Sequence, residues 1–361
     1  MINNVVYIGG FDLPDKNAAG IRVTNIGRIF ENIGYNPIFL SYKNKKVIDY
    51  KYKIIYVDVN NYYICSFKKI IKQIEQIENI KYIVTYNLPS LLLLKLIKYS
   101  KKNQIRILGD ITEWYGSQGN NLFQKALKGI DSFVRMRILN KKMDGIIAIS
   151  KFLYNYYSKY TNTVLIPPLY DICEIVKTEN VITNKIKLIY AGQVGRKKER
   201  IDKIIDAIKK VNDLGKLKIE LNIYGISKES YEKIYNTKFD DNFVKFYGKV
   251  SNSVCKEAIL NSNFSIIIRD NNRVTMAGFP TKFVESISLG VPVISNAYSN
   301  VSDYINDNGI LIDMNSLANE LNEKLLEIQG KNFVAKNDTF LYKNYINQFN
   351  EFLKEIGSND D

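Results

Sequence analysis

The amino-acid sequence predicts an α/β fold made of two doubly wound domains. Short apolar runs of strand length alternate with segments whose apolar residues recur at helical spacing, and this alternation starts twice along the chain. Runs that are apolar on both faces are typical of parallel sheets covered by helices. The length of 361 residues also suits two domains of roughly 150 residues each.

The first domain is expected to span residues 1–167. Its first apolar run ends at Gly9-Gly10, and Val23, Ile26 and Phe30 then recur at helical spacing before the next run. The same reasoning places strands at 5–8, 38–40, 54–57, 82–85, 105–108, 146–149 and 164–166.

The pattern restarts after Pro167-Pro168, so the second domain is expected to span residues 168–339. Its strands are predicted at 186–190, 219–224, 244–246, 264–268, 291–294 and 310–312, with a helix over 201–208. An aromatic-rich helix at 340–356 and a polar tail would pack back on the first domain. Ligands of doubly wound sheets bind beyond the carboxyl ends of the strands, so we expect the site in a cleft between facing domains.

Charge and rare residue types exclude several classes of function. Lys and Arg number 51 against 37 Asp and Glu, and the net charge of +14 indicates an anionic partner. The sequence has no histidine, which excludes Ser-His-Asp and Cys-His catalysis and most zinc sites. Three scattered cysteines support neither a disulfide framework nor a thiolate metal site and favour a cytoplasmic location. We expect no secretory signal and no membrane span.

The strongest local motif runs from Ala277 to Ser286 and reads AGFPTKFVES. Its glycine allows a ligand to approach the backbone, its proline suits a first helical turn, and the new helix start attracts an anion. Glu285 lies too far inside that helix to cap it and could accept a pair of hydroxyls. The alternative is an ordinary amphipathic helix with a solvated Glu.

A second motif, Tyr190 to Arg200, reads YAGQVGRKKER and combines glycines with fixed cations. A diphosphate leaving group needs such cations if its developing charge is to be stabilised without a metal. Arg269, at the end of a predicted strand, is expected at the rim of the site, where it could pair with phosphate. Solvated basic residues at a helix start are the alternative for this motif.

These motifs, in their order along residues 3–313, resemble the family 4 retaining glycosyltransferases of the GT-B fold. The resemblance implies that Glu285 binds the nucleotide ribose and that Arg196 and Lys198 bind the diphosphate. Ala277 stands where the family has a Glu that contacts the donor sugar. The resemblance extends donor binding to the glycine turn before the first-domain helix, to the Gly-x-Val turn and to the start of the 281–288 helix, with these residues: Gly20, Val250, Arg269, Gly278, Phe279, Pro280, Thr281 and Lys282.

The segment Gly109 to Gly116, GDITEWYG, resembles a subgroup of bacterial polysaccharide enzymes that share the Asp-x-x-Glu-Trp-Tyr and Ala-Gly-Phe-Pro-Thr-Lys motifs. Asp110 and Glu113 become candidates for a catalytic role that orients the sugar or acceptor, and Trp114 and Tyr115 for a sugar-stacking wall. Arg22 could hold an anionic acceptor group or could simply snorkel, with its charged end in solvent. A buried structural Trp with capping carboxylates is an equal alternative.

Two basic, aromatic-rich segments, 123–142 and 151–159, would suit shallow docking at an anionic membrane, unless they are ordinary helices with solvated lysines. We therefore expect a cytoplasmic enzyme at the inner face of the cell membrane. It would transfer sugar from a nucleotide donor, UDP-sugar being preferred, to a saccharide or lipid-linked acceptor in surface polysaccharide assembly. We expect no catalytic metal, because no Asp-x-Asp follows a predicted strand, and no cofactor besides the donor co-substrate. A non-catalytic subunit and, distantly, a nucleic-acid-binding protein are the alternatives.

Overall fold

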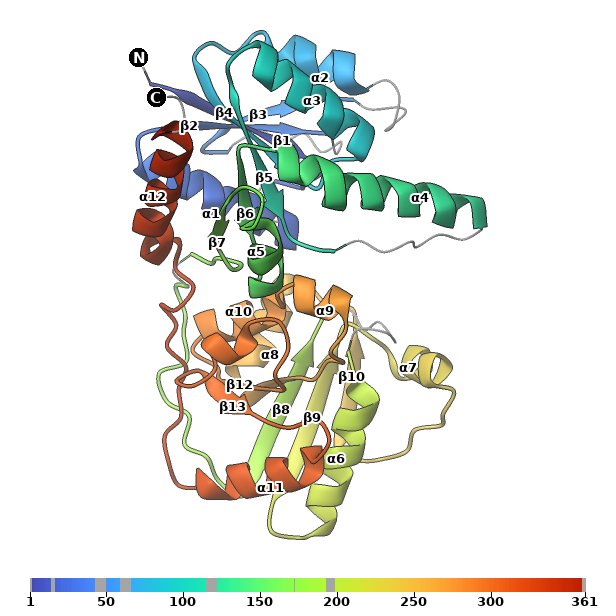
Figure 1. The fold of residues 1–361 in the computed structure, drawn as a ribbon. Helices are drawn as coiled ribbons and strands as arrows, with labels where there is room; N and C mark the ends of the chain where they lie inside the picture. The colour runs from blue at the N-terminus through green and yellow to red at the C-terminus, as the bar shows by residue number, and fades with distance from the viewer. Residues whose placement is uncertain are drawn as a thin grey trace. The chain divides into compact units, whose positions relative to one another are not determined.

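The structure is a computed structural model, in which the chain forms two compact units. The structure describes residues 2–13, 17–42, 50–58, 66–114, 122–171, 173–192 and 199–358. The first unit comprises Met1–Asp171, Ala277–Phe279 and Leu341–Asp361, and the second comprises Ile172–Met276 and Pro280–Phe340. Each unit is built on one parallel sheet (Figure 1).

The first sheet has seven strands in the order β3-β2-β1-β4-β5-β6-β7, and every pair is parallel. The strand order reverses between β1 and β4, which is the arrangement of a doubly wound sheet. Each predicted strand of this region is present: β1 (Asn4–Gly9), β2 (Asn36–Ser41), β3 (Lys53–Tyr56), β4 (Ile80–Tyr86), β5 (Arg106–Ile111), β6 (Gly145–Ala148) and β7 (Asn162–Leu165).

Helices cover both faces of this sheet. Helices α1 (Ala18–Asn32) and α12 (Ile346–Gly357) share one core cluster, in which Phe30 and Phe349 meet edge to face at 5.0 Å. Helices α2 (Ser66–Ile74) and α3 (Ser90–Lys102) lie on the opposite side (Figure 1). Helix α4 (Leu122–Val134) continues into a π-helical turn, Arg135–Leu139, and α5 (Lys151–Tyr157) follows β6.

The C-terminal helix begins later than predicted. Phe340 is buried in the second unit, and Tyr342–Tyr345 form a 3-10 turn before α12 starts at Ile346. Within α12, the buried residues Phe349, Phe352, Leu353 and Ile356 follow helical spacing. The aromatic residues before Ile346 therefore belong to the approach to the helix.

The second sheet has six parallel strands in the order β10-β9-β8-β11-β12-β13. Its predicted strands are also all present: β8 (Lys185–Ala191), β9 (Lys218–Tyr224), β10 (Val244–Gly248), β11 (Phe264–Ile267), β12 (Val293–Ser295) and β13 (Gly309–Leu311). The order reverses between β8 and β11. The prediction of two doubly wound α/β domains is confirmed.

Two pairs of helices enclose this second sheet. Helices α6 (Ile201–Asp213) and α11 (Leu317–Glu327) pack in one core cluster, while Ile259 of α8 (Asn252–Leu260) lies in a second cluster with Leu289, which follows α10 (Thr281–Ser288). Two shorter helices, α7 (Lys228–Tyr235) and α9 (Arg273–Ala277), follow β9 and β11. Lys177 joins the incoming chain to α8, because its ammonium donates to the carbonyls of Leu260 and Ser262 at 2.9 and 3.0 Å.

Candidate functional site

A buried cluster of charged side chains lies beyond β8 and β11, the neighbouring strands at which the second sheet reverses its order. Tyr190 is on β8, Glu199 follows that strand, and Arg269 follows β11. Lys282 comes from the first turn of α10. A reversal of strand order is where doubly wound sheets bind their ligands, so this position marks a candidate binding site.

Two cations of this cluster share one carboxylate. Arg269 Nη2 lies 2.8 Å from Glu199 Oε1, and Lys282 Nζ lies 3.3 Å from the same oxygen. Lys282 Nζ also donates to the Tyr190 hydroxyl and lies over its ring. The Arg269 and Glu199 side chains are each 5% exposed, and that of Lys282 is 17% exposed. Arg269, Glu199 and Lys282 together carry a charge of +1, and Lys282 is the more exposed of the two cations.

Gly192 makes room for the Lys282 side chain. Its φ of +142° lies where side chains are rarely tolerated, and a Cβ there would clash with Lys282 Cε. The glycine that ends β8 thus lets the ammonium of α10 pass close to the backbone and reach Tyr190.

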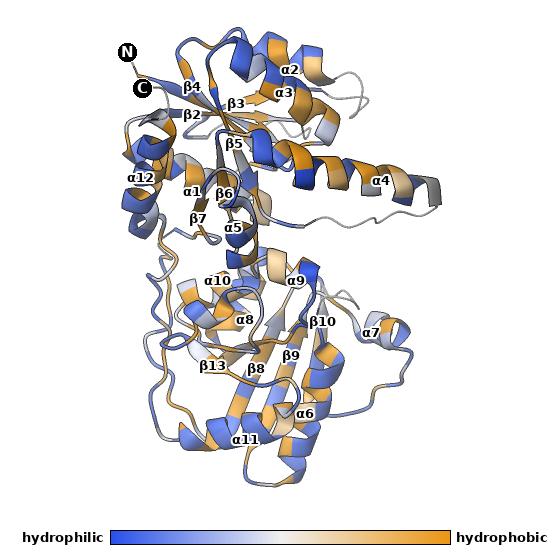
Figure 2. Cartoon of the chain, viewed as in Figure 1, coloured by the Kyte–Doolittle hydropathy of each residue, from blue (hydrophilic) through white to orange (hydrophobic). Residues whose placement is uncertain are grey.

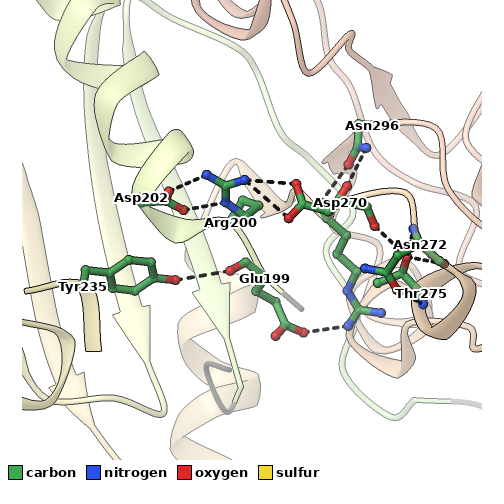
Figure 3. A network of polar contacts seen from close by, with 9 residues as sticks. Glu199, Arg200, Asp202, Tyr235, Asp270, Asn272, Thr275 and Asn296 are labelled. Carbon is green, nitrogen blue, oxygen red and sulfur yellow. Dashed lines mark hydrogen bonds and ion pairs between the residues drawn. The ribbon is translucent and has the colours of Figure 1, made fainter. Parts of the chain in front are cut away.

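Backbone and side-chain hydrogen bonds hold the cluster in place (Figure 3). The Asn296 side chain, after β12, makes two hydrogen bonds to the backbone of Arg269. It accepts from the Arg269 N–H and donates to the Arg269 carbonyl, each at 2.9 Å. The Tyr235 hydroxyl donates to the Glu199 carbonyl at 3.2 Å, and Arg200 pairs with Asp202 and Asp270. The charged side chains are therefore fixed before any ligand arrives.

Burial shifts the pKa of the neighbouring tyrosine. Burial, followed by the Glu199 carboxylate, raises the pKa of Tyr190 well above its usual range. Tyr190 is therefore a neutral group at any physiological pH.

Helix α10 begins where the sequence predicts an anion seat. Pro280 is the N-cap residue rather than a residue of the first turn, and the exposed Thr281 begins the helix. Lys282 and Glu285 are three residues apart and lie on the same side of α10. Burial, and then the Glu285 carboxylate, raises the pKa of the Cys255 thiol to about 11, which places Glu285 near α8.

The Gly-x-Val turn lies at the end of β10. Gly248 has a φ of +66°, and its carbonyl accepts from the Gly225 N–H at 2.6 Å, so the turns after β9 and β10 are joined. Val250 is 38% exposed in this turn. Tyr224 and Tyr247, at the ends of the two strands, stack with ring centroids 4.4 Å apart and planes at 1°.

The expected position of Arg269 at the rim is wrong. The residue is 4% exposed, and its guanidinium is neutralised by Glu199. Lys282 is the more exposed cation of the cluster. Of the other predicted donor-binding residues, Phe279 is buried and Gly278 half-buried, and Ala277 is wholly buried. Arg196 and Lys198 lie outside the described residues.

In the first unit, Arg22 and Asp110 pair with each other in the interior. The Arg22 guanidinium lies 2.6 Å from Asp110 and also donates to the carbonyls of Ile166 and Pro167. Asp110 is wholly buried and accepts a further bond from Tyr7 at 2.5 Å. This geometry favours the structural alternative for Asp110 over contact with an acceptor. Arg22 is 3% exposed, so the expectation that it snorkels into solvent is wrong.

The remaining predicted residues of the first unit are placed as follows. The Gly20 N–H donates to the Asn17 side chain at 2.9 Å, as part of the N-cap of α1. Glu113 and Trp114 are half-buried, and Trp114 meets Phe152 and Tyr156 of α5 edge to face. Tyr115 lies outside the described residues.

A cavity of about 330 Å³ lies at the ends of β11, β12 and β13. Asn271, Asn296, Asp313 and Lys324 are among its lining residues. None of the predicted donor-binding residues lines it, but Asn296, which holds the backbone of Arg269, does.

Residues 171–337 match the family model described as glycosyl transferases group 1. The structure is similar to sucrose-phosphate synthase from Thermosynechococcus elongatus, with a TM-score of 0.71, 15% identity and 99% of both chains covered. The fold is GT-B. It is also similar to Anabaena HepE in complex with UDP and glucose, with a TM-score of 0.63, 12% identity and coverage of 98% of this chain and 100% of the other. The pneumococcal O-GlcNAc transferase GtfA in complex with UDP and GlcNAc has a TM-score of 0.63, 11% identity and coverage of 98% and 99%.

No curated protein matches the sequence. The GT-B assignment therefore rests on the two sheets and on the matched region, which contains the whole Arg269–Glu199–Lys282 cluster. Sequence reasoning missed Glu199 and Asn296 as parts of the site. Glu199 carried a signal, because it is the single acid in the basic run 196–200, whereas Asn296 carried none.

Proposed function

We propose that the protein is a retaining glycosyltransferase that moves a sugar from a nucleotide diphosphate donor to a saccharide or lipid-linked saccharide acceptor. The observation that carries the proposal is the buried cluster with surplus positive charge at the strand reversal of the second sheet. It lies in the region that matches the group 1 glycosyl transferases. A UDP-sugar is the preferred donor, in line with the complexes of HepE and GtfA with UDP.

The chemistry that the cluster supports is departure of a diphosphate. Negative charge grows on the diphosphate as the bond to the sugar breaks, and prearranged cations stabilise it because they need no reorganisation. Lys282 and the N–H groups at the start of α10 would supply this stabilisation, with Arg196 and Lys198 as further candidates. Glu285, on the same side of α10, would accept the ribose hydroxyls.

Retention of configuration would follow from attack of the acceptor hydroxyl on the face that the diphosphate leaves. A diphosphate oxygen would take the hydroxyl proton, so no dedicated side-chain base is needed. We expect no metal requirement and place the reaction in bacterial surface polysaccharide assembly, as in capsule or exopolysaccharide synthesis.

Thermal-shift measurements without metal test the donor site. We expect UDP, compared with GDP and TDP, to stabilise the wild type, and Glu285→Ala and Lys282→Met each to remove most of the shift. Lys336→Met is the matched control, because this exposed lysine of the same unit pairs only with Asp307 among the described residues. Absence of a shift with every nucleotide would overturn the donor site.

Ala277 motivates the second candidate, a non-catalytic subunit with the same fold. The residue is wholly buried where the family has a Glu that contacts the sugar. The two candidates differ in turnover: release of UDP from UDP-sugars supports an enzyme, whereas UDP binding without any release supports the subunit.

A further inference from the structure

Helix α4 exposes an apolar stripe. Leu127, Ile130 and Phe133 are 52%, 63% and 53% exposed. Their spacing of three residues aligns them along one face of the helix. The face of the segment that packs on the unit carries the buried residues Ser132, Arg135, Met136 and Leu139. The exposed stripe therefore points away from these packed residues, and Figure 2 shows hydrophobic bands along α4.

The segment that carries this stripe is strongly basic. Residues 122–142 contain six basic residues and a single acid, Asp131. The Asp131 carboxylate accepts a hydrogen bond from the Ser90 N–H at 2.7 Å, so it pairs with a backbone donor at the N-terminus of α3. Exposed basic residues lie on the same segment: Lys125, Lys128, Arg137 and Lys142. The exposed surface thus combines large apolar side chains with cations.

Aromatic rings and cations meet at the end of the stripe. The Arg137 guanidinium lies 5.2 Å from the Phe133 ring and 5.9 Å from the Trp114 ring. Lys141 Nζ lies 3.6 Å from the centroid of Tyr160, which is 53% exposed. Tryptophan and tyrosine suit the boundary between lipid and water, because each has an apolar ring and a polar atom.

We propose that α4 and these aromatic residues lie in the surface of an anionic lipid bilayer. An interfacial helix carries an apolar face and basic residues on its polar face, and both are present. A second copy of the chain fits less well, because dimerisation through α4 would bring two segments of net charge +5 together. Nucleic acid would engage the cations and leave the apolar stripe without a role. No described helix is long and apolar enough to cross a bilayer, so the helix would lie in the plane.

Vesicle flotation tests this surface without any donor or acceptor. We expect the wild type to float with phosphatidylcholine vesicles containing about 30% phosphatidylglycerol and not with phosphatidylcholine alone. Leu127→Ser, Ile130→Ser and Phe133→Ser combined should weaken partitioning at least about tenfold. Ile175→Ser, Leu214→Ser and Val254→Ser combined form the control, because these residues are 70%, 59% and 45% exposed in the second unit.

Charge variants and fluorescence add independent readouts. Lys125→Gln and Lys128→Gln should each weaken binding about fivefold. Trp114 is the single tryptophan, so its emission should shift to the blue when anionic vesicles are added. Equal binding to neutral vesicles would overturn the proposal, as would unchanged binding of the α4 triple variant or a wild-type dimer that this variant disrupts. UDP stabilisation of the triple variant separates this result from the fate of the proposed function.

Discussion

Two buried clusters, one in each unit, each combine an arginine, a carboxylate and a tyrosine, but the second also contains a lysine. In the first unit, Arg22 pairs with Asp110, and Tyr7 donates to the same carboxylate. In the second, Glu199 pairs with both Arg269 and Lys282, and Tyr190 accepts from Lys282. The first cluster is neutral and closed, with side chains at most 3% exposed. The second keeps a surplus cation that is partly exposed.

The comparison teaches how a structural ion pair differs from a binding site. A neutral, enclosed pair has no attraction left for a ligand, and removing either partner leaves a buried charge. A cluster with one more cation than carboxylate is completed by an anion. The predictions below test this difference, starting with the largest effect.

Loss of the carboxylate should lower the free energy of unfolding more in the neutral cluster than in the second cluster. Asp110→Asn leaves the Arg22 guanidinium buried without a counter-charge, so the free energy of unfolding should fall by about 3 kcal/mol or more. Urea denaturation measures this loss. Glu31→Gln is the control, because Glu31 pairs with Lys51 at an exposed position and should lose less than about 1 kcal/mol. Similar losses in the two variants would contradict the structural role of Asp110.

Removing the carboxylate of the second cluster should lower the stability of the protein, and bound anions should restore part of it. Glu199→Gln leaves Arg269 and Lys282 without their shared carboxylate, and the protein should lose stability in chloride. Phosphate at ten times its Kd should return about 1.4 kcal/mol. Melting temperatures in chloride and phosphate at equal ionic strength measure the repair. Asp110→Asn should show no such repair, and if it does, the two clusters do not differ in the way that we infer.

The strands and their order could be predicted because each is a compact apolar run, which is a local property. The contacts within the two clusters could not, because their residues are 88 positions apart for Arg22 and Asp110 and 83 for Glu199 and Lys282. The resemblance of residues 277–286 to a family motif identified Lys282. It placed Arg269 at the rim because a residue that follows a strand can face either solvent or interior. The ion pair with Glu199 keeps the Arg269 side chain in the interior. The two residues are 70 positions apart, so only the fold shows that they pair.

Alanine substitutions at Gly215 and Gly192 distinguish strain in the local backbone from an effect on the binding site. Gly215→Ala has open space around it at a φ of +75°, so it should cost about 1 kcal/mol of stability and leave UDP binding unchanged. Gly192→Ala should cost more, because a φ of +142° lies outside the left-handed helical region that other residues can reach. Its Cβ would also push aside the end of the Lys282 side chain and should weaken UDP binding about tenfold. Calorimetric titration with UDP makes the comparison. Unchanged UDP affinity in Gly192→Ala would remove Lys282 from the binding site.

The smallest expected effect concerns the thiol of Cys255, which reports the charges on α10. Burial first, and then Glu285, raises the pKa of this thiol to about 11, while Lys282 acts to lower it. The thiolate is the reactive form, so alkylation at pH 9 should be more than about tenfold slower than for a free cysteine. Glu285→Gln removes a negative charge and should speed the reaction, whereas Lys282→Met should slow it further. Mass-spectrometric peptide mapping follows Cys255, with Glu320→Gln as a distant control. Rates that change in the same direction in both variants would contradict a site in which a carboxylate and an ammonium on α10 act on one thiol with opposite sign.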